Sequence, residues 1–167
     1  MCNPRLKRCD RSAGSRLGAL LMFAVASLFF GCRTHPPLPP ADLSAPGWRL
    51  QQGQAVWKPT RSRPALAGEL ILATMTNGDF FVQFSKTPFT LATAQVANGQ
   101  WQIEFGNNKH RWSGRGELPS RLVWFQLPRT LTVGSLKTNW LFTQPSSDSW
   151  RLENPRTGEM LEGGFFP

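Results

Sequence analysis

Short turn sequences divide the chain after Trp48 into brief apolar segments, and they limit its fold more than any other feature. Asn77-Gly78 and Asn98-Gly99 each separate two apolar or alternating segments. An Asn-Gly pair suits a type I′ turn, in which both central residues have positive φ and the flanking strands pair antiparallel. Gly106-Asn107-Asn108 and Pro155–Gly158 have similar turn compositions. The spacing predicts a mainly β domain, built as an antiparallel meander.

Alternation within these segments predicts that one face of the sheet is aromatic. Side chains two residues apart lie on the same face of a strand. Such a face must cover a helix, a second sheet or a bound apolar ligand. We therefore take its members as candidate ligand-binding residues, with a closed core as the alternative: Phe80, Val82, Phe84, Trp101, Ile103, Phe105 and Trp112.

Three further segments modify the meander. Leu70-Ile71-Leu72 is apolar on both faces, which predicts a central strand covered on both sides. Pro88 predicts a tight connection at 86–88, because proline is poorly tolerated inside a central strand. The segment 119–128 suits either a strand or a short helix with Leu122, Phe125 and Gln126 inward. Pro119 as a helix start and Pro128 as a stop favour the helix.

The first 31 residues have the pattern of a signal peptide. Five basic residues precede an uncharged apolar run from Leu17 to Phe30, which has 14 residues. A membrane-spanning helix needs about 20 such residues, whereas a signal-peptide core needs roughly 7–15. The run ends in Leu28-Phe29-Phe30-Gly31-Cys32. We expect cleavage before Cys32.

This ending resembles the lipobox of bacterial lipoproteins, with Phe29 where Leu is commonest. The resemblance implies that Cys32 becomes the lipid-attachment residue, carrying a diacylglycerol and an N-linked acyl chain. Stable anchoring takes about two lipid signals, so such a residue would anchor the chain to a membrane. Arg33 stands where an inner-membrane retention signal would be Asp, which favours the outer membrane with the domain facing the periplasm.

Residues 32–47 would then form the lipidated end and a tether. Five prolines between Thr34 and Gly47 favour extended polyproline geometry, so we expect a semi-rigid spacer. Without residues 1–31 the chain keeps 14 basic and nine acidic residues, a net charge of +5 instead of +9. This charge lacks the dense basic footprint of a nucleic-acid binder.

The chemistry expected of an enzyme is absent from the sequence pattern. Ser113 lies three residues after His110, but the G-x-S-x-G elbow is missing. No metal-ligand spacing, phosphate loop or dinucleotide fingerprint occurs. We therefore expect no catalytic residues, no metal and no cofactor.

The domain from Trp48 to Pro167 resembles the LolA/LolB-like superfamily of lipoprotein carriers and outer-membrane receptors. The resemblance rests on Val56-Trp57, strands at 68–75 and 79–86, and the turn Lys86-Thr87-Pro88-Phe89. It continues in Leu122, Trp124 and Leu127-Pro128, and in the C-terminal hairpin from Trp150 to Glu159. It implies an incomplete barrel around an apolar cavity, closed by one or two short helices. Leu66 is the nearest candidate for the receptors' exposed apolar loop tip.

Two functions follow as hypotheses. In the first, an anchored lipoprotein binds acyl chains of lipids or other lipoproteins on its aromatic face and takes part in outer-membrane lipoprotein insertion. In the second, the same residues fill a packed core, and the domain is an envelope scaffold that docks a protein partner. An apolar cavity favours the first hypothesis, and a solid core favours the second.

The anchor is tested by Cys32→Ala, expressed in a bacterium with two membranes. We expect the variant to leave the membrane fraction, because no other segment of the sequence is predicted to attach the chain to a bilayer. Fractionation followed by immunoblotting measures the shift. A variant that still sediments with membranes contradicts the lipid anchor.

Overall fold

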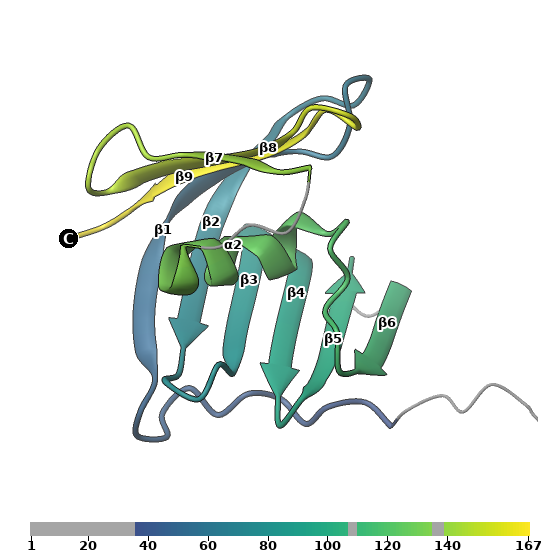
Figure 1. The fold of residues 1–167 in the computed structure, drawn as a ribbon, viewed down its shortest axis with the longest axis vertical. Helices are drawn as coiled ribbons and strands as arrows, with labels where there is room; N and C mark the ends of the chain where they lie inside the picture. Colours follow the sequence, from purple (N-terminus) through teal and green to yellow (C-terminus); the bar gives the residue numbers. More distant parts are fainter. Residues whose placement is uncertain (1–35, 107–109, 135–138) are drawn as a thin grey trace, which may run out of the picture. The chain divides into compact units, whose positions relative to one another are not determined.

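The computed structural model describes residues 36–106, 110–134 and 139–167, and these residues form one nine-stranded antiparallel sheet with one helix (Figure 1). The predicted signal peptide and the predicted lipid-attachment residue Cys32 lie outside the described residues. The strands are β1 (Arg49–Lys58), β2 (Leu66–Thr74), β3 (Phe80–Lys86), β4 (Phe89–Ala97), β5 (Gln100–Phe105), β6 (His110–Arg115), β7 (Leu141–Thr143), β8 (Ser149–Asn154) and β9 (Glu159–Phe165).

The strand order confirms the predicted meander. Strands lie in the order β6-β5-β4-β3-β2-β1-β9-β8-β7, and every pair is antiparallel. The sheet is not closed, because β6 and β7 are its two edges. The incomplete barrel is therefore confirmed. β2 is the central strand, as predicted, although Ile71 on its outer face is only half-buried.

The turns follow the sequence signals with one difference. Asn98 and Gly99 both have positive φ, 52° and 70°, as a type I′ turn requires. The β2–β3 turn is longer than Asn77-Gly78 alone. The Met75 amide donates to the Asp79 carbonyl at 2.9 Å, so five residues form the connection. Of the Asn77-Gly78 pair, only the glycine has positive φ.

The ambiguous segment 119–128 forms part of a helix, α2 (Val123–Val133), which continues beyond the predicted end at Pro128. Pro128 lies inside it, although proline costs roughly 3 kcal/mol in a helix interior. Burial offsets this cost, because every residue from Val123 to Pro128 is buried. Two threonine hydroxyls also donate to helix carbonyls, Thr130 to Gln126 at 2.8 Å and Thr132 to Pro128 at 2.7 Å. Gly134 then ends the helix with φ 67°.

The core lies between α2 and the inner face of the sheet, which we define as the face that carries Leu70 and Leu72. Figure 1 shows α2 across the strands β1 to β4, with β7 to β9 turned over toward it. Trp150, Leu152 and Leu161 from β8 and β9 complete the core. Leu66 begins β2 and packs against this core, so it is not an exposed loop tip.

Glycines allow β9 to approach β1 where the sheet curls. A Cβ atom at Gly53 would clash with the Gly164 carbonyl oxygen, and one at Gly163 would clash with the Gln54 carbonyl oxygen. These backbones lie closer than side chains permit. The close approach lets the last three strands continue the sheet beyond β1.

The first described segment, residues 36–48, lies on the outer face of the sheet, and we call it the strap. The Leu38 amide donates to Gln102 Oε1 at 2.8 Å, and Gln95 Nε2 donates to the Pro39 carbonyl at 3.2 Å. Leu38, Ala41 and Leu43 are half-buried. The described part of the predicted spacer is therefore held on the domain.

The buried side chain of Gln126 allows a prediction about the stability of the domain. Gln126 is only 1% exposed, and neither amide atom has a hydrogen-bond partner in the described parts of the chain. A buried polar group without a partner costs about 1–3 kcal/mol, so Gln126→Met should stabilise the domain by a similar amount. Urea unfolding measures this change. The control Gln52→Met, on an exposed residue, should shift stability by less than about 0.5 kcal/mol. A destabilised Gln126→Met variant would mean that the amide has a partner.

Candidate functional site: a cleft beside helix α2

Four of the seven predicted ligand-binding residues are fully buried beneath the helix. Phe80, Val82 and Phe84 of β3 and Ile103 of β5 are at most 4% exposed. The ring of Phe84 lies 5.5 Å from that of Trp124, and the ring of Phe80 lies 6.1 Å from that of Phe125. These residues occupy the predicted face, and α2 covers it.

The other three lie on β5 and β6: Trp101 and Phe105 flank Ile103 along β5, and Trp112 lies on the edge strand β6. Trp101 packs across Gly114 and lies 5.7 Å from the ring of Phe125. Phe105 lies between Trp57, at 6.0 Å, and Trp112, at 5.7 Å. Trp112 is 51% exposed. The seven residues thus share a face, but they do not surround one cavity.

A hollow on the inner face lies beside the C-terminal half of α2, and we call it the helix cleft. Its volume is about 660 Å³, within the roughly 300–1,000 Å³ of ligand pockets. Leu72, Met75 and Leu131 give it apolar walls. The remaining lining residues are polar or glycine: Arg49, Gln51, Thr74, Thr76, Gly78 and Thr132.

A smaller hollow of about 210 Å³ borders the helix cleft. The two share Thr74, Met75, Gly78 and Thr132. Phe80 lines this second hollow together with Leu118 and Pro128, and it is the one predicted residue that borders either hollow. Sequence reasoning missed the helix cleft because its walls come from β1, β2 and the part of α2 beyond Pro128.

Electrostatics at the helix cleft are set by one cation. Arg49 lines the cleft at the start of β1 and is exposed. It forms no ion pair with any residue in the described ranges. Asp79 lies in the β2–β3 turn and lines the adjoining smaller hollow, and its carboxylate accepts from the Asn98 amide at 3.1 Å and from Asn77 Nδ2 at 2.9 Å. The cleft therefore combines apolar walls with an unneutralised positive charge.

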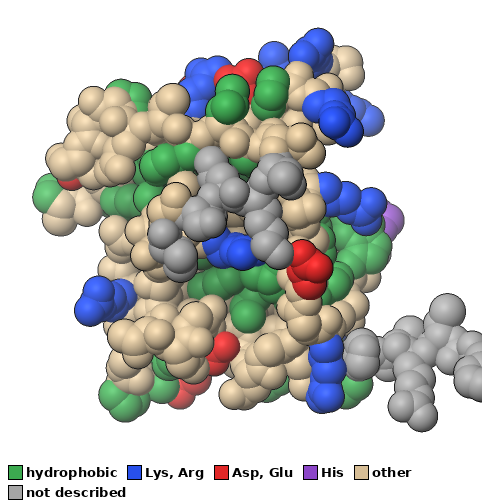
Figure 2. All heavy atoms as spheres, viewed as in Figure 1, with side chains coloured by type: hydrophobic (Ala, Val, Ile, Leu, Met, Phe, Trp, Pro, Cys, Tyr) green, Lys and Arg blue, Asp and Glu red, His purple; other side chains and the backbone are tan. Residues whose placement is uncertain are grey.

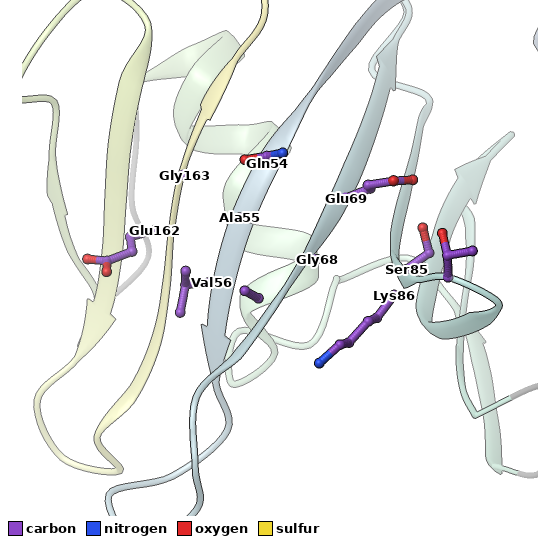
Figure 3. Close-up of a pocket in the computed structure, with 11 residues that line it drawn as sticks. Gln54, Ala55, Val56, Gly68, Glu69, Ser85, Lys86, Glu162 and Gly163 are labelled. Carbon is purple, nitrogen blue, oxygen red and sulfur yellow. The ribbon is translucent and has the colours of Figure 1, made fainter.

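A further hollow of about 530 Å³ lies on the outer face, over β9, β1, β2 and the end of β3 (Figure 3). Its floor is made of small residues, including Gly68 and Gly163. Figure 3 shows the side chains of Glu69 and Glu162 pointing away from each other. Glu162 is also paired with Arg151 at 2.9 Å. These charges do not converge on a common point, so the hollow is a shallow groove without a polar centre.

One half-buried carboxyl group, that of Glu159, lies on the aromatic side of the domain. Burial raises the pKa of Glu159 to about 7, and a hydrogen bond from Trp57 Nε1 at 3.3 Å opposes this shift. Trp57 itself lies 5.1 Å from the ring of Trp124. No second titratable group pairs with Glu159 among the described residues, so this arrangement is not an acid–base pair.

The described part of the chain brings together no group of side chains suited to catalysis or to metal binding. His110 is paired with Phe105 and Ser113 with Gln102, which places the two side chains on opposite faces of the sheet. No group of three His, Cys, Asp or Glu side chains in the described ranges could hold a metal ion. Among the same residues, no helix is long and apolar enough to cross a bilayer.

Comparison of the sequence with protein-family models and with curated protein sequences finds no match. The site is therefore interpreted from its own geometry.

The half-buried Glu159 predicts a pH dependence of stability. Between pH 4.5 and about 7 the folded chain binds more protons at this group than the unfolded chain does. The free energy of unfolding should therefore fall as pH rises through this window, by at most about 3 kcal/mol. Glu159→Gln should remove this fall and make the domain more stable than the unaltered chain at pH 8.

Urea unfolding at pH 5 and pH 8 measures the difference between the two proteins. Glu153→Gln is the matched control, because Glu153 is an exposed partner of Arg151 and should leave the pH dependence nearly unchanged. An equal pH dependence for Glu159→Gln and the unaltered chain would contradict the raised pKa.

Proposed function

We propose that this chain is a lipoprotein anchored through Cys32, whose β-domain binds acyl chains of lipids or other lipoproteins in the helix cleft. The leader and lipobox pattern support the anchor and an outer-membrane location facing the periplasm. The resemblance to LolA/LolB-like proteins supports an acyl ligand and a role in lipoprotein insertion. The activity is binding, without a catalytic step.

The helix cleft is the observation that carries this proposal. An acyl chain has no directional groups, so it is bound by burial of apolar surface at about 25 cal/mol per Å². Met75 in the β2–β3 turn and Leu131 on the helix are half-buried and offer such a surface, with the buried Leu72 beneath them. The aromatic face has a different part in this proposal. Phe80, Phe84 and Trp101 pack on the rings of Trp124 and Phe125, and so hold the helix that borders the cleft.

Arg49 favours an amphiphile with an acidic headgroup. A guanidinium group can bind a carboxylate or a phosphate through two parallel hydrogen bonds. Its place on the cleft lining would put the headgroup at the cleft entrance and the chain along the apolar walls. A fatty-acyl chain with a carboxylate is therefore a suitable probe.

The packed aromatic core supports the second candidate, an envelope scaffold that docks a protein partner. Phe80, Val82, Phe84 and Ile103 leave no room for a ligand at their positions. The unpaired edges β6 and β7 could add a strand from a partner, since edge strands present free backbone groups. This candidate predicts a stable partner in mild detergent extracts and no saturable lipid binding.

Arg49→Glu tests the binding proposal. We expect weaker saturable binding of a fluorescent 16-carbon fatty acid, by about tenfold, because losing and reversing one charge contact costs about 1–2 kcal/mol. The control Arg63→Glu makes the same charge change in the exposed β1–β2 loop, at the opposite end of β1. Fluorescence titration measures both affinities.

Thr132→Trp tests the apolar part of the cleft. Thr132 is exposed and borders both hollows, so a large side chain there should fill the space without entering the core. Probe binding should be lost, while loss of the hydrogen bond from Thr132 to Pro128 should lower the free energy of unfolding by only about 1 kcal/mol. Unchanged binding by the Thr132→Trp variant, or no binding by the unaltered domain, would leave the scaffold as the better proposal.

A further inference from the structure

The strap determines where the proposed anchor can lie relative to the sheet. Besides its two hydrogen bonds, it borders a hollow of about 500 Å³ on the outer face through Pro37, Leu38, Pro40 and Ala41. A second hydrogen bond fixes the orientation of the Gln102 amide. Gln102 Nε2 donates to Glu104 Oε1 at 2.8 Å, which leaves the Gln102 Oε1 free to accept from the Leu38 amide. Arg111 Nε donates to the same Glu104 oxygen at 2.6 Å. An ion pair thus orients the glutamine that fixes the strap.

The strap crosses the sheet near one end, which we call the turn end. This end carries the β2–β3 and β4–β5 turns, and the opposite loop end carries the β1–β2 loop and the β3–β4 turn. Strand register places Gln102 beside Gln95, and Gln95 beside Phe81. The same row continues through Ala73 to Leu50 near the start of β1. Figure 1 shows the strap running below the strands from β1 toward β6.

The mouth of the helix cleft lies at the same end, on the other face of the sheet. Its lining includes Arg49 at the start of β1 and Met75, Thr76 and Gly78 in the β2–β3 turn. The strap and the cleft are thus placed at one end by independent sets of residues. Nothing in the proposed binding activity requires this coincidence.

Chain length then limits the position of the bilayer. From Cys32 to Leu38 there are six residue steps, which reach about 20 Å when fully extended. From the row of Leu50 to Lys58, β1 continues for eight residues, about 27 Å, and the β1–β2 loop follows. With the strap docked, a lipid on Cys32 cannot bring the β1–β2 loop to the membrane surface.

We propose that the turn end faces the bilayer, so that the membrane itself supplies and receives the acyl ligand at the mouth of the helix cleft. This inference rests on the proposed function. Leu50 is 50% exposed at this end, and Arg49 lies next to it. An apolar side chain beside a cation suits the boundary between acyl chains and phosphate headgroups.

Charge alone would favour the other orientation, and the reach of the anchor decides against it. The loop end carries Lys58, Arg61, Arg63 and Lys86. Figure 2 shows Lys and Arg side chains gathered over the β1–β2 loop and the β8–β9 turn. Each cation near an anionic surface contributes about 1 kcal/mol and acts only within a Debye length of about 8 Å. The reach of the anchor falls about 7 Å short of Lys58, and Arg61 and Arg63 follow in the β1–β2 loop, so the length of the chain disfavours contact between these loop cations and the anchoring membrane.

Site-specific quenching tests the orientation in the full-length lipidated protein. After processing and acylation no other thiol remains, so Leu50→Cys and Arg63→Cys can each carry one fluorescent label. The proteins are reconstituted into phosphatidylglycerol–phosphatidylethanolamine vesicles that contain headgroup-nitroxide lipid. We expect severalfold stronger quenching at position 50 than at position 63. Gln102→Ala should bring the two values closer by releasing the strap.

The matched control is Gln83→Ala, because the Gln83 side chain borders the same hollow but forms no hydrogen bond with a described residue. It should leave the difference between the two labels unchanged. Equal quenching, or stronger quenching at position 63, in vesicle-bound protein overturns the orientation while the anchor stands. Protein that stays in solution overturns the anchor and the orientation together. Strong quenching at position 50 supports the orientation even where the fatty-acid probe fails to bind.

Discussion

The burial of helix α2 against the inner face of the curled sheet is the interaction on which the rest of the domain depends. Trp124 and Phe125 are at most 1% exposed and pack on Phe84 and Phe80 of the meander. Truncating a buried aromatic residue of this kind to alanine typically costs about 3–5 kcal/mol. This packing keeps Pro128 inside a helix that local preference would end there. The helix also determines what space remains, because its N-terminal half fills the aromatic face and its C-terminal half borders the helix cleft.

The two faces of the sheet are covered by different kinds of interaction. The inner face uses apolar burial, which is strong and non-directional, to hold α2. The outer face between β3 and β6 is covered by the strap through hydrogen bonds to Gln95 and Gln102. These bonds are individually weak, about 1 kcal/mol each, but they fix a direction. In the proposed function, the inner face provides the ligand site and the outer face orients that site toward the membrane.

The meander was predictable because its signals are local. Asn98-Gly99 adopts the positive φ values that its turn type needs, and strand alternation placed Phe80, Val82 and Phe84 on one face. The length of the β2–β3 turn was not predictable, because Met75 and Asp79 pair across it through backbone groups of any residue type. The extent of α2 was missed for a similar reason. The free-energy cost of Pro128 in a helix can be recognised from the local sequence, whereas the burial that offsets this cost comes from strands far away in the sequence.

The sequence by itself determined the strand segments, their antiparallel pairing and which side chains share the aromatic face. These properties depend on backbone φ preferences and a two-residue period, which each short segment carries alone. Only the tertiary structure decided that α2 covers this face, that a cleft remains beside its C-terminal half, and that the proline-rich segment lies on the sheet. These outcomes depend on the volumes and hydrogen bonds of residues as far apart as Leu38 and Gln102 or Leu72 and Leu131. Such pairings form only when the sheet has curled and brought them together.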